Sequence, residues 1–244
     1  MKFCIKFPKN IFKFTNSLVL LYKIKIVKLL DNGHHINFFY NNKLFLPKDN
    51  KLRPALFLDR DGVLIKEKHF ISKSTDVELE NGINDLIYLA NMLRLPIVII
   101  TNQSGIARKI TTWDNYFKVT EKMINLINKD NTIIAIYANG LGVESPKYSW
   151  RKPSPSMILN AANYLKLDLS KSLLIGDRLS DLLSGFNAGL LNLFHVRTGH
   201  GNVERDDVKK FFSKNDHSDL IKIKYINKIG EELFHDLQVL IGKQ

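Results

Sequence analysis

The pattern of apolar and polar positions changes at Ala55. From there to residue 196, short apolar runs alternate with stretches in which apolar residues recur at helical spacing. Five runs are each long enough for a buried parallel strand, at residues 55–58, 96–100, 133–137, 173–175 and 193–196. The alternation predicts an α/β fold with a doubly wound parallel sheet, in which ligands bind at the carboxyl ends of the strands.

Helical periodicity separates these runs and returns near the C-terminus. The predicted helices lie at residues 83–93, 117–127 and 158–165. After Gly201 the chain is polar to about Asp219. A further strand at 220–225 and a docking helix at 230–241 are predicted to complete the domain.

Residues 1–54 have a different pattern and are interpreted as an N-terminal extension of a domain at 55–244. Residues 22–28 alternate with period two, and two short strands at 36–40 and 43–46 are predicted around a turn. We expect a small β element there. The polar, turn-rich residues 47–54 serve as a linker.

The chain of 244 residues is 45% hydrophobic, which excludes global disorder. Its net charge is +12, and residues 1–54 carry +9 of this, from ten Lys and one Arg against two Asp. Such a segment attracts nucleic acid or anionic lipid. Alternatively, the whole chain is rich in Lys, Ile and Asn, and this general enrichment explains the basic charge of residues 1–54 without a binding partner. We favour that explanation because aromatic and basic residues do not interleave, so no nucleic-acid partner is expected.

Cys4 is the only cysteine. An internal disulfide and a cysteine-based zinc site are therefore excluded, and a reducing, cytoplasmic location is expected. No apolar stretch approaches the roughly 18 residues that span a bilayer, so no membrane partner is expected. An organellar presequence remains an alternative because no acidic residue precedes Asp31. A monomer is favoured.

The first strand run ends in two carboxylates and a glycine, Asp59, Asp61 and Gly62. Alternate residues of a strand point to the same side, so the two carboxylates start close together. One carboxylate can attack phosphorus while the other moves protons, provided that a cation offsets the two like charges. Asp-x-Asp-Gly is also typical of surface turns, so this motif alone does not decide.

Chemistry-bearing residues follow other strand runs too. Thr101 opens a hydroxyl and amide cluster that leads into a helix, an arrangement suited to an anion. Asp177 and Asp181 follow the run at 173–175, and Lys152 precedes a Pro-initiated helix. Each segment alone fits an ordinary turn or helix start. With the Asp59 motif there are four such segments, and they occur near the strand ends in the order expected for one site. This combination favours a phosphoryl-transfer site.

These residues resemble the four motifs of the haloacid dehalogenase-like phosphatases. More narrowly, they are similar to the D-glycero-D-manno-heptose 1,7-bisphosphate 7-phosphatases and the histidinol-phosphate phosphatases. The resemblance runs from about residue 55 to about residue 201. It rests on Asp59-Arg-Asp-Gly-Val, Thr101-Asn-Gln-Ser-Gly-Ile-Ala-Arg108, Arg151-Lys-Pro-Ser-Pro-Ser-Met157 and Gly176-Asp-Arg-Leu-Ser-Asp181.

The resemblance implies a role for each matching residue. Asp59 would be the nucleophile that forms an aspartyl-phosphate, and Asp61 would protonate the leaving oxygen and then activate water. Thr101 and Lys152 would hold the phosphoryl oxygens.

The resemblance also implies Mg²⁺ as the cofactor. Asp177, Asp59 and the main-chain carbonyl of Asp61 would bind it, with Asp181 as a direct or supporting ligand.

Substrate specificity is expected from residues beside the motifs. Arg108, Arg151 and Arg178 are candidates to grip a second phosphate, and Asn102 to orient substrate or the nucleophile loop. Surface pairing with a carboxylate is the alternative for each arginine, most of all for Arg108.

The sequence also departs from the family pattern. Many relatives carry a zinc loop, but Tyr148 and Trp150 stand at two of its cysteine positions. Zinc is therefore not expected, and packing must hold the loop instead. Lys109 replaces a common glycine, and residues 65–81 suffice only for a small flap, not a cap domain.

The sequence thus predicts a Mg²⁺-dependent phosphatase for a small sugar phosphate, with heptose 1,7-bisphosphate the favoured substrate. Two alternatives remain. One is a histidinol-phosphate phosphatase. The other is a terminal phosphatase of nucleic acids that uses the basic residues 1–54.

Overall fold

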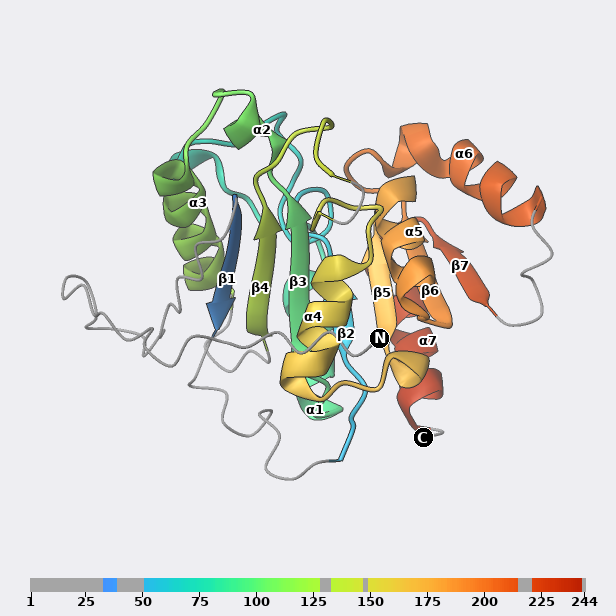
Figure 1. The fold of residues 1–244 in the computed structure, drawn as a ribbon. Coiled ribbons are helices and arrows are strands. Elements are labelled where there is room, and N and C mark those ends of the chain that lie inside the picture. Colours follow the sequence, from blue (N-terminus) through green and yellow to red (C-terminus); the bar gives the residue numbers. More distant parts are fainter. Residues whose placement is uncertain (1–32, 39–50, 128–132, 147–148, 215–220, 243–244) are drawn as a thin grey trace.

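The chain folds around one seven-stranded sheet with helices on both faces, as the computed structural model in Figure 1 shows. The structure describes residues 33–38, 51–127, 133–146, 149–214 and 221–242. The strands lie in the order β1-β4-β3-β2-β5-β6-β7. The prediction of a doubly wound α/β fold is confirmed.

Six of the strands are parallel, and the first is antiparallel to its neighbour. The strands are β1 (His34–Phe38), β2 (Leu56–Leu58), β3 (Ile97–Asn102), β4 (Ile133–Asn139), β5 (Leu173–Gly176), β6 (Asn192–Val196) and β7 (Lys222–Ile226). All residues of β2, β4, β5 and β6 are buried, as expected for strands covered on both faces. Each predicted apolar run from residue 55 onward forms a strand.

Helices cover the sheet in two layers. They are α1 (Ile83–Met92), α2 (Ser104–Ala107), α3 (Trp113–Leu126), α4 (Ser156–Leu165), α5 (Leu179–Ala188), α6 (Gly201–Lys214) and α7 (Glu231–Gly242), with 3₁₀ turns η2 (Ser74–Asp76) and η3 (Leu169–Lys171). The apolar faces of α1, α3 and α7 form one core with the sheet. Those of α4, α5 and α6 form the other core on the opposite face.

The strand order places the carboxyl end of β2 where the chain changes direction. From β2 the chain runs outward through β3 to β4, and it then returns to β5 on the other side of β2. Ligands of such sheets bind at this kind of switch point. The residues that follow β2, β3 and β5 are therefore brought to one place.

The N-terminal segment contributes a strand to this sheet. β1 pairs with β4, with His34 opposite Asn139 and Phe38 opposite Ala135. The sequence suggested a local two-stranded element, because pairing with a distant strand leaves no local pattern. The second predicted strand at 43–46 and the alternation at 22–28 lie outside the described residues. The division at residue 54 stays a proposal.

Helix α6 forms from the polar stretch after Gly201. Two apolar side chains on one of its faces, Val208 and Phe212, are buried. Arg205 is also buried, and its Nε donates to Nδ1 of His195 at 2.8 Å. Burial and the charge of Arg205 lower the pKa of His195 to about 4, so this histidine is a neutral structural acceptor.

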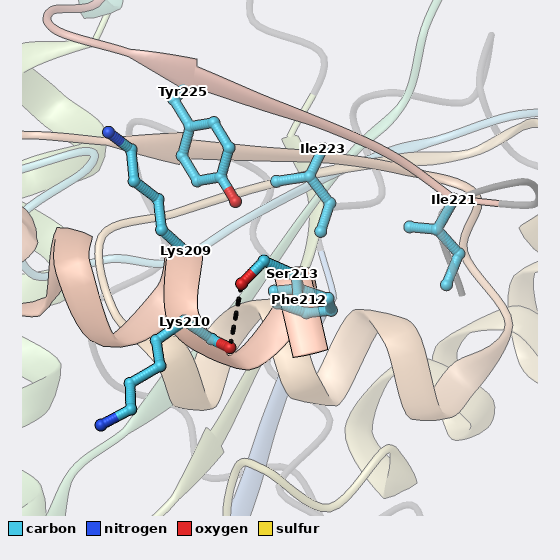
Figure 2. A pocket seen from close by; sticks show the side chains of 7 residues that line it. All are labelled: Lys209, Lys210, Phe212, Ser213, Ile221, Ile223 and Tyr225. Atoms are coloured by element: carbon cyan, nitrogen blue, oxygen red, sulfur yellow. Dashed lines mark hydrogen bonds between the residues drawn. The ribbon is translucent and has the colours of Figure 1, made fainter. Parts of the chain in front are cut away.

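A groove of about 500 Å³ lies between α6 and β7, lined among others by Lys209, Phe212 and Tyr225 (Figure 2). None of the strand-end residues lines it. Within the described residues, no helix combines the length and the apolar character needed to cross a membrane.

Candidate active site

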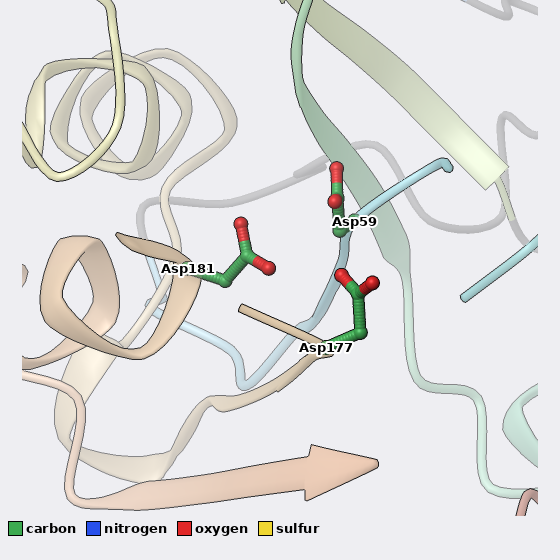
Figure 3. A group of neighbouring side chains, drawn as sticks. All are labelled: Asp59, Asp177 and Asp181. Carbon is green, nitrogen blue, oxygen red and sulfur yellow. The ribbon is translucent and has the colours of Figure 1, made fainter. Parts of the chain in front are cut away.

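Three buried carboxylates converge at the carboxyl end of the sheet (Figure 3). Asp59 follows β2, Asp177 follows β5, and Asp181 lies in the first turn of α5. One oxygen from each lies within 4.8 Å of the others. Each residue is at most 6% exposed, so water screens their mutual repulsion poorly.

Lys152 supplies a positive charge inside this group. Its Nζ lies 2.8 Å from Oδ1 of Asp59 and 2.5 Å from Oδ1 of Asp181. The same ammonium donates to the carbonyl of Ile100 at 3.1 Å. Two carboxylates and one carbonyl therefore surround this ammonium.

Two glycines enclose the carboxylate of Asp177. A Cβ on Gly62 would lie 2.4 Å from its Oδ2, and one on Gly199 would lie 2.3 Å from it. Both glycines have positive φ, at 85° and 54°. The main-chain N–H of His200 donates to the same oxygen at 2.7 Å. Glycine is required at both positions for the two loops to close on this carboxylate.

Two of these carboxylates, Asp59 and Asp177, resist ionisation despite Lys152. Burial raises the pKa of Asp59 to about 7, and Asp181 and Asp61 add to the increase while Lys152 opposes it. Burial, followed by the charges of Asp181 and Asp59, also raises the pKa of Asp177. Burial alone would lower the pKa of Lys152, but the two carboxylates beside it raise it above its ordinary value. A further cation would favour ionisation of Asp59 and Asp177.

The residues fit a divalent metal ion. Oδ1 of Asp177 is buried and has no hydrogen-bond partner among the described residues. Carboxylate oxygens are the ligands that Mg²⁺ prefers in proteins. A metal bound by Asp59, Asp177 and Asp181 would satisfy this oxygen and offset the excess negative charge.

Asp61 lies beside this group but not in it. Its Oδ1 accepts from Nη2 of Arg60 at 2.9 Å, and its Oδ2 accepts from Nε2 of Gln103 at 2.7 Å. The hydroxyl of Thr101 lies 3.4 Å from the same Oδ2. Asp61 is 20% exposed, more than the three converging carboxylates. Its carboxylate is therefore partly accessible to solvent at the edge of the site.

Asn102 connects two motifs through the main chain. Its Nδ2 donates to the carbonyl of Lys152 at 3.2 Å, and its Oδ1 accepts from the N–H of Lys152 at 3.1 Å. This pair of hydrogen bonds fixes the segment that carries the ammonium. Asn102 thus acts on the loop around Lys152, next to the nucleophile candidate.

The three candidate arginines lie close enough to influence one another. Burial lowers the pKa of Arg151, and the charges of Arg108 and Arg178 lower it further. Each is held by a different group. Nη1 of Arg151 lies 3.5 Å from the carbonyl of Leu141, and Nε of Arg178 lies 2.7 Å from Oε1 of Glu204.

Arg108 lies over the ring of Phe70, with its Cζ 5.5 Å from the ring centre. Phe70 belongs to the short flap at 65–81 and has φ of 63°. A Cβ on Gly105 would lie 2.8 Å from this ring, so the flap packs directly on the helix that follows Thr101. Through Phe70, the flap therefore contacts both Arg108 and the helix that follows Thr101.

The segment around Trp150, where the sequence predicts packing in place of zinc, contains an aromatic contact. The ring of Trp150 lies 5.5 Å from that of Tyr137. The hydroxyl of Ser149 donates to that of Ser145 at 3.1 Å. Tyr148 lies outside the described residues. Lys109, which replaces a common glycine, has φ of 58°, a conformation that favours glycine.

Sequence reasoning missed several residues around the site. Arg60 and Gln103 lie inside motifs, yet nothing in their spacing shows that they hold Asp61. Gly199 and His200 follow β6, a predicted strand after which no motif was identified. Their position after that strand was the available signal.

Comparisons with known proteins identify relatives of this chain. The family model HAD-hydrolase-like matches residues 149–220. A D-glycero-beta-D-manno-heptose-1,7-bisphosphate 7-phosphatase from Helicobacter pylori is 34% identical over 69% of this chain and 97% of its own length. The corresponding enzyme from Mesorhizobium japonicum is 35% identical over 56% of this chain, and the match spans 66% of that protein.

Other matches extend the same pattern. A D-glycero-alpha-D-manno-heptose-1,7-bisphosphate 7-phosphatase from Photorhabdus laumondii is 38% identical over 64% of this chain and 88% of that protein. A crystal structure from Mesorhizobium loti, described as a HAD-like phosphatase, superposes with a TM-score of 0.70 at 27% identity and covers 88% of this chain and 96% of that one. The chain belongs to the haloacid dehalogenase-like phosphatases, in the family of the heptose 1,7-bisphosphate 7-phosphatases.

Proposed function

We propose that this chain is a Mg²⁺-dependent phosphatase that removes the 7-phosphate of D-glycero-D-manno-heptose 1,7-bisphosphate. The observation that carries the proposal is the buried group of Asp59, Asp177 and Asp181 around Lys152. Relatives named for this reaction support the choice of substrate. A cytoplasmic location belongs to the same proposal.

Asp59 is assigned as the nucleophile. Lys152 and the main-chain N–H of Arg60 hold its Oδ1, at 2.8 and 2.7 Å. Its Oδ2 is therefore the oxygen that we assign to attack phosphorus. As the new O–P bond forms, the bond from phosphorus to the sugar oxygen breaks, and an aspartyl-phosphate results.

Asp61 is assigned as the acid and then the base. In its protonated form it gives its proton to the leaving sugar oxygen. It then takes a proton from the water that attacks phosphorus, which releases phosphate and restores Asp59. Its position beside Thr101, outside the converging carboxylates, supports this role.

Thr101 and Lys152 are assigned to the phosphoryl oxygens. Since the ammonium already contacts Asp59, Asp181 and the carbonyl of Ile100, phosphate binding competes with these contacts. Mg²⁺, when bound by Asp59, Asp177, Asp181 and the carbonyl of Asp61, supplies positive charge that offsets the phosphoryl oxygens.

The second phosphate of the substrate is assigned to Arg108, Arg151 and Arg178. Burial lowers the pKa of Arg151, and the positive charges of Arg108 and Arg178 lower it further. A bound anion would offset the repulsion among these three arginines. A guanidinium also matches phosphate in bidentate geometry. Relatives carry names for both the alpha and the beta anomer, so the proposal covers both.

Phosphate release from the two candidate substrates tests this function. Purified full-length chain with Mg²⁺ is given the heptose 1,7-bisphosphate and, separately, histidinol phosphate. We expect a higher kcat/KM for the bisphosphate, and no release by Asp59→Asn. Faster hydrolysis of histidinol phosphate would replace the substrate assignment, and full activity of Asp59→Asn would overturn the nucleophile.

A further inference from the structure

A buried arginine lies between the two carboxylates of the first motif. The side chain of Arg60 is 1% exposed, and its Nε and Nη2 contact the carboxylate of Asp61 at 3.2 and 2.9 Å. Two donors on one carboxylate fix its orientation as well as its position. A fully buried arginine is rare unless its charge is paired.

The same guanidinium also packs on an aromatic ring. Its Cζ lies 5.2 Å from the centre of the Tyr116 ring, which α3 supplies from a distant part of the chain. Tyr116 is itself 2% exposed. A cation over an aromatic face is attracted most strongly when both are removed from water. Arg60 is thus held by a helix outside the four motifs.

Gln103 holds Asp61 from the other side. Its Nε2 donates to Oδ2 of Asp61 at 2.7 Å and to the hydroxyl of Thr101 at 2.8 Å. Because Arg60 contacts Oδ1 and Gln103 contacts Oδ2, the two residues hold both oxygens of one carboxylate. Asp61 is partly exposed, so without these contacts its side chain would be free to turn toward solvent.

We infer that Arg60, supported by Tyr116, and Gln103 are positioning residues that aim the Asp61 carboxylate at the leaving oxygen. This inference rests on the proposed role of Asp61 as acid and base. The competing explanation is that Arg60 only stabilises the fold. The two explanations differ in whether the activity lost on replacing Arg60 depends on the leaving group of the substrate.

A general acid matters most when the leaving group is a poor one. A sugar hydroxyl leaves poorly, whereas p-nitrophenolate leaves readily without a proton. The value of kcat/KM reports on steps up to departure of the leaving group, so it isolates this dependence. For Arg60→Met, we expect kcat/KM to fall about 30-fold on the heptose bisphosphate and less than about three-fold on p-nitrophenyl phosphate.

Further variants sharpen the test. Arg60→Lys keeps a donor and should recover part of the activity on the sugar phosphate, whereas Gln103→Leu should lose activity in the same leaving-group-dependent way. If Arg60→Met does not fold, Gln103→Leu decides in its place. Arg205→Met is the matched control, because Arg205 is also buried and hydrogen-bonded but contacts His195 and Ile226. It should lower stability without changing the ratio between substrates.

Asp61→Asn separates this inference from the proposed function. If this variant loses equal activity on both substrates, Asp61 is not the acid and the proposed role fails. If it loses mainly the sugar phosphate activity while Arg60→Met and Gln103→Leu lose both activities equally, the positioning inference alone is overturned. Parallel, leaving-group-dependent losses in all three variants support it.

Discussion

The ammonium of Lys152 lies 2.8 Å from Oδ1 of Asp59, at the centre of a site that water barely reaches. Asp177 and Asp181 complete the group. Three ionised carboxylates and one ammonium leave two negative charges. A divalent cation offsets such an excess, and so does protonation. Burial, with added repulsion from Asp181 and Asp61, raises the pKa of Asp59 to about 7. Both the chemistry and the stability of this region therefore depend on Lys152.

Replacing this lysine should destabilise the protein at neutral pH. Lys152→Met leaves the buried carboxylates without their cation, and we expect the free energy of unfolding at pH 8 to fall by about 3 kcal/mol. Denaturant unfolding measures it. Lys68→Met is the control, because Lys68 pairs with Glu78 on the surface and should change stability by less than about 1 kcal/mol. Equal losses in the two variants would contradict the account.

The stability of the metal-free protein should fall as pH rises from about 4 to about 7. Asp59 has a pKa of about 7 in the folded chain and about 3.9 in the unfolded chain, so in this window the folded state binds more protons. Mg²⁺ prefers the ionised carboxylates. The rise in Tm on adding MgCl₂ should therefore be larger at pH 8 than at pH 5.5.

Thermal unfolding with and without MgCl₂ at several pH values measures this linkage. At each pH, the Tm without MgCl₂ is subtracted from the Tm with MgCl₂. This subtraction removes the contribution of titratable groups that the metal does not affect. Asp177→Asn should reduce the Mg²⁺-dependent shift at every pH. A shift that is the same at pH 5.5 and pH 8, or that persists in full in this variant, would speak against metal binding by these carboxylates.

A methyl group at Gly62 should weaken Mg²⁺ binding. Its Cβ would lie 2.4 Å from Oδ2 of Asp177, so Gly62→Ala must displace that carboxylate or the loop. Gly189→Ala is a matched control, because Gly189 has φ of 89° but no atom within 4 Å of the added Cβ. Both variants carry backbone strain of about 1 kcal/mol. Titration calorimetry should show at least about ten-fold weaker Mg²⁺ binding only for Gly62→Ala.

Glu204 should influence recognition of the second phosphate. Its Oε1 contacts Nε of Arg178, and its Oε2 accepts from the N–H of Leu179, each at 2.7 Å. Glu204→Ala frees Arg178, and we expect KM for the bisphosphate to change by about three-fold or more while KM for p-nitrophenyl phosphate stays constant. The control Asp236→Ala breaks an ion pair with Lys224 and should alter neither value. Equal effects on both substrates would rule out this role.

Much of the fold followed from local patterns. Buried parallel strands are continuous apolar runs, so β2 to β6 were readable from sequence alone. The strand predicted at 36–40 overlaps β1, but its place in the sheet was not predicted, since its partner β4 lies about a hundred residues away and strand pairing depends on that distant surface. Helix α6 was also missed, because only a few apolar residues, among them Val208 and Phe212, mark its buried face.

The candidate site shows the same division. The topology makes Asp59, Thr101 and Asp177 predictable, because parallel strands end at one edge. The contacts of Arg60 were not predictable, since an arginine between two aspartates is normally exposed and its ring partner Tyr116 comes from another helix. Gly199 was missed for a similar reason: its role exists only because its loop closes over Asp177.

The most direct test of the central claim is to trap the covalent intermediate. The protein is mixed with heptose 1,7-bisphosphate and Mg²⁺, quenched in acid during turnover and reduced with borohydride, which converts an aspartyl-phosphate to homoserine. Mass spectrometry of the peptide that contains residue 59 then locates the change. We predict substrate-dependent conversion at Asp59 and at no other aspartate. Rapid phosphate release with Asp59 unmodified, or conversion at a different residue, would contradict the account.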